Sequence, residues 1–229
     1  MRTGVGTLFG RRGFVIACIC TTGVAACAQD AEAPPGETTV EAEPTPGGYT
    51  VRLDSERSDP GQFELSREDP NLRILTGPTG IAYRAQDQIT SGDFEVSATF
   101  VQYGAPLGYR EAYGIFVGGR ELEGEDLEYT YLLIRPTGDY LVKRRIGEIT
   151  ETIVDWTPHA SVVSVVAEGD EPVNTVSVQV TGGEARFIVN GTLLHSMPAS
   201  EARPYGVAGL RVNHRLDMLV TDWTLSPST

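Results

Sequence analysis

Residues 94–100 read Phe-Glu-Val-Ser-Ala-Thr-Phe, and this stretch decides the fold class. Phe94, Val96, Ala98 and Phe100 are apolar, and the residues between them are polar or charged. An alternation with period two is typical of a β-strand that has one face in a hydrophobic core and the other in solvent. The stretch therefore predicts a half-buried strand.

The same alternation recurs later in the chain, at residues 176–180 and 187–189. Turn sequences separate the predicted strands: Pro-Thr-Gly-Asp at 136–139, Gly-Gly at 182–183 and Asn-Gly at 190–191. Asn-Gly is a strong hairpin signal, because a type I′ turn needs a positive φ at both central residues. Many short strands with regular turns predict an all-β fold, a two-sheet antiparallel jelly-roll sandwich.

The start of the chain has a different composition. Arg2, Arg11 and Arg12 make it basic, and residues 13–26 form an apolar run. That run is shorter than the roughly 20 residues that a membrane-spanning helix needs. A basic start and a short apolar run are typical of a secretory signal, so we expect residues 1–27 to be a signal peptide.

Two ways of processing this leader fit the sequence. Residues 24–27, Val-Ala-Ala-Cys, resemble a bacterial lipobox, in which the cysteine is lipidated and becomes the new N-terminus. Residues 26–28, Ala-Cys-Ala, also fit a plain cleavage site. We favour lipidation of Cys27, which predicts a membrane-anchored lipoprotein facing the periplasm or the cell surface. A soluble secreted or periplasmic protein is the alternative, and the Arg11-Arg12 pair leaves both general and twin-arginine export open.

Residues 28–48 contain five acidic residues, four prolines and no basic residue. Such a segment buries too little apolar surface to offset its ordering entropy, so we expect a disordered linker. The jelly-roll domain is predicted to occupy residues 49–229. All three cysteines precede it, which excludes an internal disulfide, a cysteine nucleophile and a thiolate metal site from the predicted domain.

The charge balance is strongly acidic. The chain has 18 basic and 31 acidic residues, and losing the three leader arginines would leave 15 against 31, a net charge of −16. Proteins that bind nucleic acids carry a basic patch or stripe. We therefore predict no nucleic-acid partner.

Three blocks of the sequence resemble the laminin-G/concanavalin-like jelly-roll domains of bacterial secreted proteins, and in particular the 3-keto-disaccharide hydrolase domain family. The blocks lie in the family's order over roughly residues 50–225. They are residues 113–119 with 129–135 and 140–145, then 155–156 with 174–180 and 187–191, then 206–210 with 222–223. The resemblance implies the same jelly-roll fold and, through the family's name, a hydrolase that acts on keto-sugars or disaccharides.

An acidic stretch at residues 121–128 is the most enzyme-like feature. Glu123, Glu125, Asp126 and Glu128 approach the spacing of laminarinase-type glycoside hydrolases, whose acids share one face of a strand. Glycines precede and interrupt the stretch, so a solvated loop is the preferred interpretation and no catalytic residue is assigned. Calcium is compatible with these oxygens, but no spacing singles out a metal or cofactor site, and the three histidines follow no metal-binding pattern.

The predicted hairpin of residues 129–145 has a Tyr/Arg face. With the turn near 137–139, we expect five candidate ligand-binding residues on that face: Tyr129, Tyr131, Arg135, Tyr140 and Arg144. Tyrosine rings pack against sugars and guanidinium groups donate to hydroxyls. The same residues would also serve as ordinary cross-strand pairs, and both interpretations stay open. Leu132, Ile134 and Leu141 are expected in the core. Trp156 and Trp223 are expected to fill the core or close its edge rather than to form a binding platform.

The preferred hypothesis is a surface-anchored, non-catalytic module that recognises a carbohydrate or a cell-surface partner. The first alternative is a glycosidase-like hydrolase acting on keto-sugars or disaccharides. The second is a structural or partner-binding surface lipoprotein. Nothing in the residue pattern identifies the ligand.

Overall fold

The computed structural model describes residues 46–227. The predictions for the signal peptide, for Cys27 and for residues 28–45 lie outside the described residues. Within the described part, the elements are fourteen strands, two 3-10 turns, η1 (Pro46–Gly48) and η2 (Pro60–Gln62), and one short helix, α1 (Ala199–Ala202). No helix in residues 46–227 is long and apolar enough to cross a membrane.

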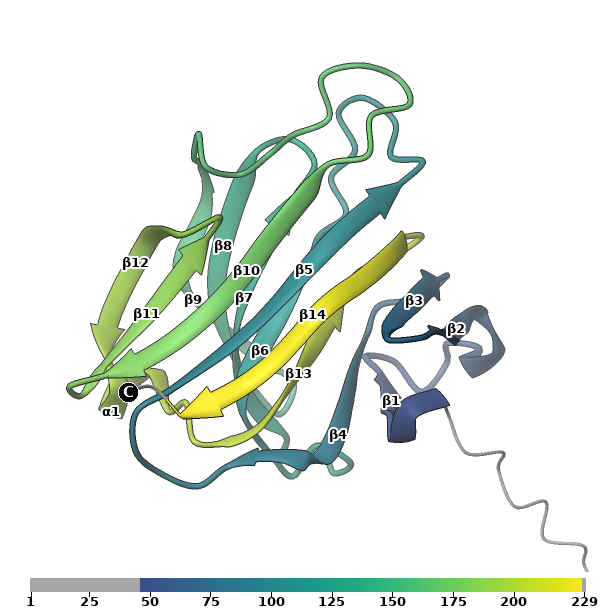
Figure 1. Ribbon diagram of the computed structural model, residues 1–229. Helices are drawn as coiled ribbons and strands as arrows, with labels where there is room; N and C mark the ends of the chain where they lie inside the picture. The colour runs from purple at the N-terminus through teal and green to yellow at the C-terminus, as the bar shows by residue number, and fades with distance from the viewer. Residues whose placement is uncertain (1–45, 228–229) are drawn as a thin grey trace, which may run out of the picture. The chain divides into compact units, whose positions relative to one another are not determined.

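The strands form two seven-stranded sheets in which every pairing is antiparallel (Figure 1), so the predicted two-sheet jelly-roll sandwich is confirmed. Sheet I has the order β1 (Thr50–Leu53), β4 (Gly80–Ile89), β13 (Gly206–Val212), β6 (Tyr113–Arg120), β7 (Glu128–Arg135), β8 (Asp139–Ile146), β9 (Ile149–Pro158). Sheet II has the order β12 (Thr192–Pro198), β11 (Glu184–Val189), β10 (Val173–Thr181), β5 (Phe94–Tyr103), β14 (Asp217–Pro227), β3 (Asn71–Thr76), β2 (Phe63–Glu68).

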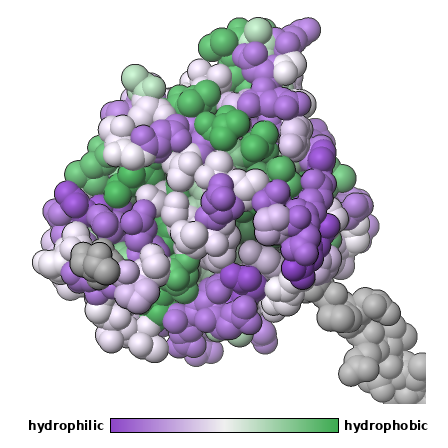
Figure 2. Space-filling view, in the orientation of Figure 1, coloured by the Kyte–Doolittle hydropathy of each residue, from purple (hydrophilic) through white to green (hydrophobic). Residues whose placement is uncertain are grey.

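The stretch that predicted the fold is the central strand β5 of sheet II. Its apolar residues are buried between the sheets and the residues between them are half-buried, as the alternation requires. β10 and β14 pair with β5 on either side, with Val178 opposite Val96 and Val220 opposite Phe100. The outer surface of these strands, which faces the viewer in Figure 2, scatters hydrophobic residues among hydrophilic ones.

The predicted turns set the register of the hairpins. Asn190 and Gly191 have φ values of 50° and 74° and join β11 to β12, which is the type I′ pattern that their sequence predicts. Residues 136–138 form the turn between β7 and β8, and Arg135 pairs with Asp139 across it.

Sheet I carries hydrophobic residues on both faces. One set faces sheet II, and a second cluster lies on the outer face. The outer cluster alternates along the strands with the inner one, and it comprises Ile81, Tyr83, Ala112, Phe116, Leu122, Leu127, Tyr129, Tyr131, Leu133 and Leu141. A second apolar face on an antiparallel sheet is unusual, because one face is commonly solvated.

Candidate functional site

The register of the β7–β8 hairpin divides the predicted Tyr/Arg face. Directly opposite residues of an antiparallel pair share a face, and Tyr131 is opposite Lys143 whereas Ile134 is opposite Tyr140. The prediction that Tyr140 and Arg144 share a face with Tyr129, Tyr131 and Arg135 is therefore wrong. The turn has an odd number of residues, and a one-residue change of register moves every side chain of a strand to the other face.

Tyr140 lies in the core between the sheets. Its hydroxyl donates a hydrogen bond to the carbonyl oxygen of Leu194 over 3.1 Å. The residue therefore ties sheet I to β12 of sheet II and is not part of an open surface.

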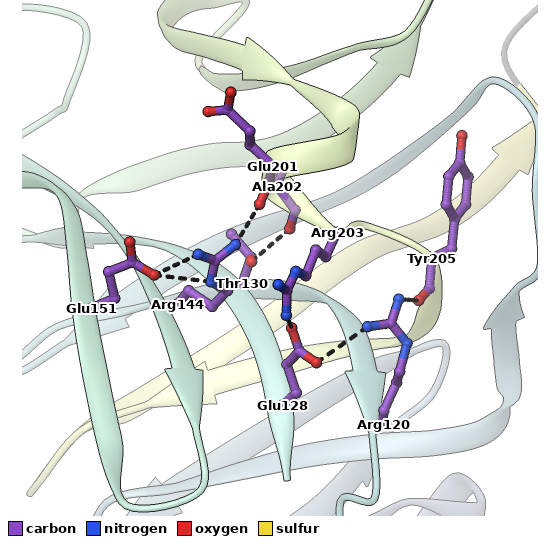
Figure 3. Close-up of polar contacts among 9 residues, drawn as sticks. All are labelled: Arg120, Glu128, Thr130, Arg144, Glu151, Glu201, Ala202, Arg203 and Tyr205. Carbon is purple, nitrogen blue, oxygen red and sulfur yellow. Dashed lines mark hydrogen bonds and ion pairs between the residues drawn. The ribbon is translucent and has the colours of Figure 1, made fainter.

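Arg144 holds the short helix α1 in place (Figure 3). Its guanidinium pairs with Glu151 and donates to the carbonyl oxygen of Glu201, and Thr130 donates to the carbonyl oxygen of Ala202 over 2.7 Å. These bonds satisfy carbonyl groups that a helix C-terminus leaves without intrahelical partners. Arg144 thus has a structural explanation.

The acidic stretch is not the strand that a laminarinase-type arrangement needs. Residues 121–127 form the predicted loop, and only Glu128 lies on a strand. Glu128 accepts hydrogen bonds from Arg203 over 2.9 Å and from Arg120 over 3.3 Å (Figure 3). The one-face arrangement of a laminarinase-type strand is absent from this part of the described chain.

The other three predicted residues, Tyr129, Tyr131 and Arg135, share the outer face of sheet I. The two tyrosines are 1% and 7% exposed, with ring centroids 5.6 Å apart, so their rings form a covered floor rather than an open stacking surface. Burial raises the pKa of Tyr131 to about 12, so its hydroxyl stays neutral near pH 7. The surface above this floor is charged.

Arg135 and Trp156 lie together at one end of this face. The guanidinium carbon is 4.2 Å from the centre of the indole ring, and Nε donates to Asp139 over 3.0 Å. Burial alone raises the pKa of Asp139, but the hydrogen bonds from Arg135 and Thr137 outweigh that effect and lower it. Arg135 is fixed by these contacts.

At the other end, one carboxylate organises two arginines from different strands. Asp54, just after β1, accepts hydrogen bonds from both Nη atoms of Arg211 in β13 and one over 2.6 Å from Arg145 in β8. Arg211 is only 7% exposed, so its charge needs a close partner. Burial on its own raises the pKa of Asp54, but the bonds and charges of the two arginines dominate and hold it below 3.8.

A hollow of about 600 Å³ opens beside Asp54. Its walls come from the segment after β1, the acidic loop and the β8–β9 turn. They comprise Arg52, Asp54, Ser55, Glu56, Arg57, Glu125, Leu127, Arg145, Gly147 and Glu148. We call it the outer-face hollow. Its lining mixes guanidinium donors with carboxylate acceptors.

Four polar atoms of the outer face are buried without a hydrogen-bond partner among residues 46–227. They are Arg52 Nη1, Tyr83 OH, Tyr129 OH and Arg211 Nε. Buried polar groups in folded proteins are almost always bonded, so such a group calls for an ordered water or a ligand. The four atoms belong to β1, β4, β13 and β7 and share one face of sheet I, which makes this face the candidate site.

The sequence prediction missed the charged half of this site. Arg211 carried a signal, because it is the single charged residue in the apolar strand 206–212, and such a residue needs a buried counter-charge. Its partner Asp54 lies 157 residues away, and no local pattern indicates that pairing.

The described residues contain no group of three or more His, Cys, Asp or Glu side chains arranged to hold a metal ion. His214 lies in a turn just before Leu216. His195 lies on β12, and burial lowers its pKa.

No family model matches the chain, and no curated protein matches its sequence. Solved structures match its fold. The carbohydrate-binding module CBM66 from Bacillus subtilis has a TM-score of 0.55 and 9% identity, covering 78% of this chain and 95% of that one. The potassium-bound carbohydrate recognition domain of Emp46p has a TM-score of 0.53 and 9% identity, covering 79% and 89%.

A Bacillus subtilis protein of unknown function with a galectin-like fold has a TM-score of 0.51 and 11% identity, covering 78% of this chain and 88% of that one. At these identities the matches show the fold, a galectin-like or concanavalin-like jelly roll. They do not show the 3-keto-disaccharide hydrolase family, so that resemblance stays a prediction.

Proposed function

We propose that this domain is a carbohydrate-recognition module and that the outer-face hollow of sheet I is its binding site. The observation that carries the proposal is the unpartnered donor Arg52 Nη1, whose residue lines the hollow. The unpartnered Nε of Arg211 lies beside it, on a guanidinium that bonds Asp54 of the lining. Leaving a buried donor unbonded costs about 1–3 kcal/mol, so the hydroxyls of a ligand bring the acceptors that these groups lack. The named carbohydrate binders among the solved structures of this fold support the same choice of ligand.

The lining of the hollow favours a neutral, hydroxyl-rich ligand. Each sugar hydroxyl both donates and accepts, so it needs an acceptor as well as a donor nearby. Arg52 and Arg145 supply donors, and Asp54, Glu125 and Glu148 supply acceptors. A strongly anionic ligand would bring its charge close to these carboxylates, and nucleic acid would meet the same repulsion.

The hydrolase alternative has less support. Retaining glycosidases need two carboxyl groups about 5–5.5 Å apart across the scissile bond. Glu128 is bonded to Arg120 and Arg203, and Asp54 is bonded to two arginines, so neither group is free for proton transfer. Recognition without turnover fits these contacts better.

A glycan-array screen of the purified full chain tests the proposal. We expect saturable binding to a class of neutral glycans, and weaker binding of the same class by Arg52→Ala. Arg73→Ala is the matched control, because Arg73 is bonded to Asp217 on sheet II, away from the hollow. A blank array, or equal binding by both variants, would contradict the proposal.

We propose further that the module is held at the membrane by lipidation of Cys27. The support is the lipobox-like Val-Ala-Ala-Cys and the acidic, proline-rich residues that follow it. Expression in a bacterial host followed by detergent phase partition and mass spectrometry tests this. The wild-type chain should enter the detergent phase with a diacylated N-terminal cysteine, whereas Cys27→Ala should stay in the aqueous phase; identical partition of the two would overturn the proposal.

A further inference from the structure

A second hollow, of about 420 Å³, lies near the edge strands β1 of sheet I and β2 of sheet II. Residues of η1, β2, β3, β4 and β14 line it, together with Tyr49, which precedes β1. We call it the edge hollow. Its lining comprises Pro46, Gly47, Tyr49, Arg67, Pro70, Asn71, Leu72, Arg84, Val220, Asp222 and Trp223. The residues of the outer-face hollow are all different, so the two hollows are separate places on the molecule.

A β-bulge turns Trp223 toward this hollow. Thr221 is opposite Thr99 and Thr224 is opposite Ser97, so β14 has one residue more than β5 between these pairs. Asp222 takes the extra place, with a φ of 52°. Without the bulge, the period of two would put residue 223 on the outer face; with it, Trp223 packs against the core between the sheets, as Val220 does.

A positive φ at a non-glycine residue is strained, and such residues gather at binding sites. Here the strained residue is the one that places the indole. This position agrees with the sequence prediction that Trp223 lies in the core or at its edge, although that prediction gave the residue no binding role.

The indole N–H of Trp223 is buried and has no acceptor among residues 46–227. Tryptophan N–H groups usually find a partner when they are buried. The apolar side chains of Leu72 and Val220 line the same space, and they offer no acceptor. A hydroxyl or ring oxygen of a ligand in the hollow would supply it.

Arg84 is held as a fixed donor on the other wall. Its Nε and Nη2 donate to Asp87 over 2.8 and 3.0 Å, and its guanidinium carbon is 5.2 Å from the centre of the Tyr49 ring. These contacts leave Nη1 unused by Asp87. An arginine pinned in this way loses little entropy when it bonds a ligand.

We propose that the edge hollow is a second sugar site, which takes a neutral mono- or disaccharide unit. Its volume lies in the lower part of the range for small-molecule pockets, roughly 300–1,000 Å³. Its lining combines aromatic rings, apolar side chains and a few fixed polar groups. The positive charges of Arg67 and Arg84 are balanced by the negative charges of Asp87 and Asp222. The hollow therefore favours neither an anionic nor a cationic ligand. This extends the proposed function from one binding place to two.

The two tryptophans make the test specific. The chain contains only Trp156 and Trp223. Trp156 packs on the outer face of sheet I, so Trp156→Phe leaves the edge-hollow indole as the sole tryptophan emitter. We would titrate this variant with glucose, galactose, mannose, fructose, sucrose and lactose, following emission and acrylamide quenching.

At least one sugar should produce a saturable emission change and slower quenching. When Arg84→Ala is added to the Trp156→Phe variant, the affinity for that sugar should fall about tenfold, the effect expected for loss of a charged donor. Arg73→Ala is the matched control: Arg73 also makes two bonds to one aspartate, Asp217, and its guanidinium carbon is 4.7 Å from a tyrosine ring centre, but it does not line the hollow.

Flat titrations with all six sugars, in a variant whose circular dichroism matches the wild type, would overturn the second site. Equal affinity in the Arg84→Ala and Arg73→Ala variants would do the same. Arg52→Ala separates this result from the proposed function: it should lower array binding at the outer-face hollow and leave the Trp223 response unchanged.

Discussion

Arg211 and Asp54 are joined by two hydrogen bonds across the outer face of sheet I, although 157 residues separate them in the chain. The pair links β13 to the segment after β1, and Arg145 of β8 extends it across the sheet. It therefore ties together the walls of the outer-face hollow. The same contact therefore stabilises the fold and shapes the proposed binding site.

Removing the carboxylate should destabilise the domain strongly. Asp54→Ala leaves Arg211 buried and unpaired, and breaking a buried ion pair from one side costs about 3–5 kcal/mol. Asp54 is partly exposed, so we expect about 3 kcal/mol, the lower end of that range. Urea denaturation measures the loss. Glu56→Ala removes a neighbouring carboxylate that makes no ion pair within residues 46–227, so it should change stability little. A small, equal effect of both variants would contradict this account.

The contribution of Asp54 should depend on pH. Its pKa in the folded chain lies below the ordinary value of 3.8, so its stabilising effect is present above about pH 4 and is lost as the pH falls through the folded pKa. Asp54→Asn cannot titrate at this position. The stability difference between the wild type and this variant should be constant from pH 7 to 5 and should shrink below pH 4. A difference that grows on acidification would contradict the lowered pKa of Asp54.

Thr130 should contribute to the stability of the domain through one hydrogen bond. It is 1% exposed and donates to the carbonyl oxygen of Ala202 in α1. Thr130→Val keeps the shape and removes the donor, which should cost about 1 kcal/mol. Thr152→Val, on an exposed position of β9, is the control and should have little effect. If the two variants have the same denaturation midpoint, the bond to α1 does not stabilise the domain.

Replacing Gln102 by an apolar residue should stabilise the domain. Gln102 is fully buried, and neither its amide nitrogen nor its amide oxygen has a partner among the described residues. Gln102→Met replaces the amide with an apolar group of similar size, so we expect a gain of about 1 kcal/mol. Thermal unfolding measures it. A loss of stability would mean that bound water satisfies the amide.

The strands and their turns could be predicted because the relevant signals are local. The alternation at residues 94–100 and the Asn190-Gly191 turn each depend on neighbouring residues, and both are confirmed. The face on which a hairpin side chain lies is harder to predict, because it depends on the number of residues in the turn. Three residues separate β7 from β8, and this put Tyr140 and Arg144 on the inner side.

The charged site could not be predicted in the same way. Asp54, Arg145 and Arg211 meet because the segment that follows β1 brings Asp54 to the outer face of sheet I, where Arg211 of β13 and Arg145 of β8 bond the same carboxylate. The bulge at Asp222 likewise has no sequence signal of its own, although it decides where Trp223 points. Contacts between distant strands depend on the sheet order, which alternation alone does not give.

The central claim is that the outer-face hollow binds a neutral glycan. Its most direct test is calorimetric titration of the full chain with the best ligand from the array, comparing wild type, Arg52→Ala and Arg73→Ala. The account predicts a Kd about tenfold weaker for Arg52→Ala and unchanged for Arg73→Ala. An unchanged Kd for Arg52→Ala, with the variant folded like the wild type, would contradict it.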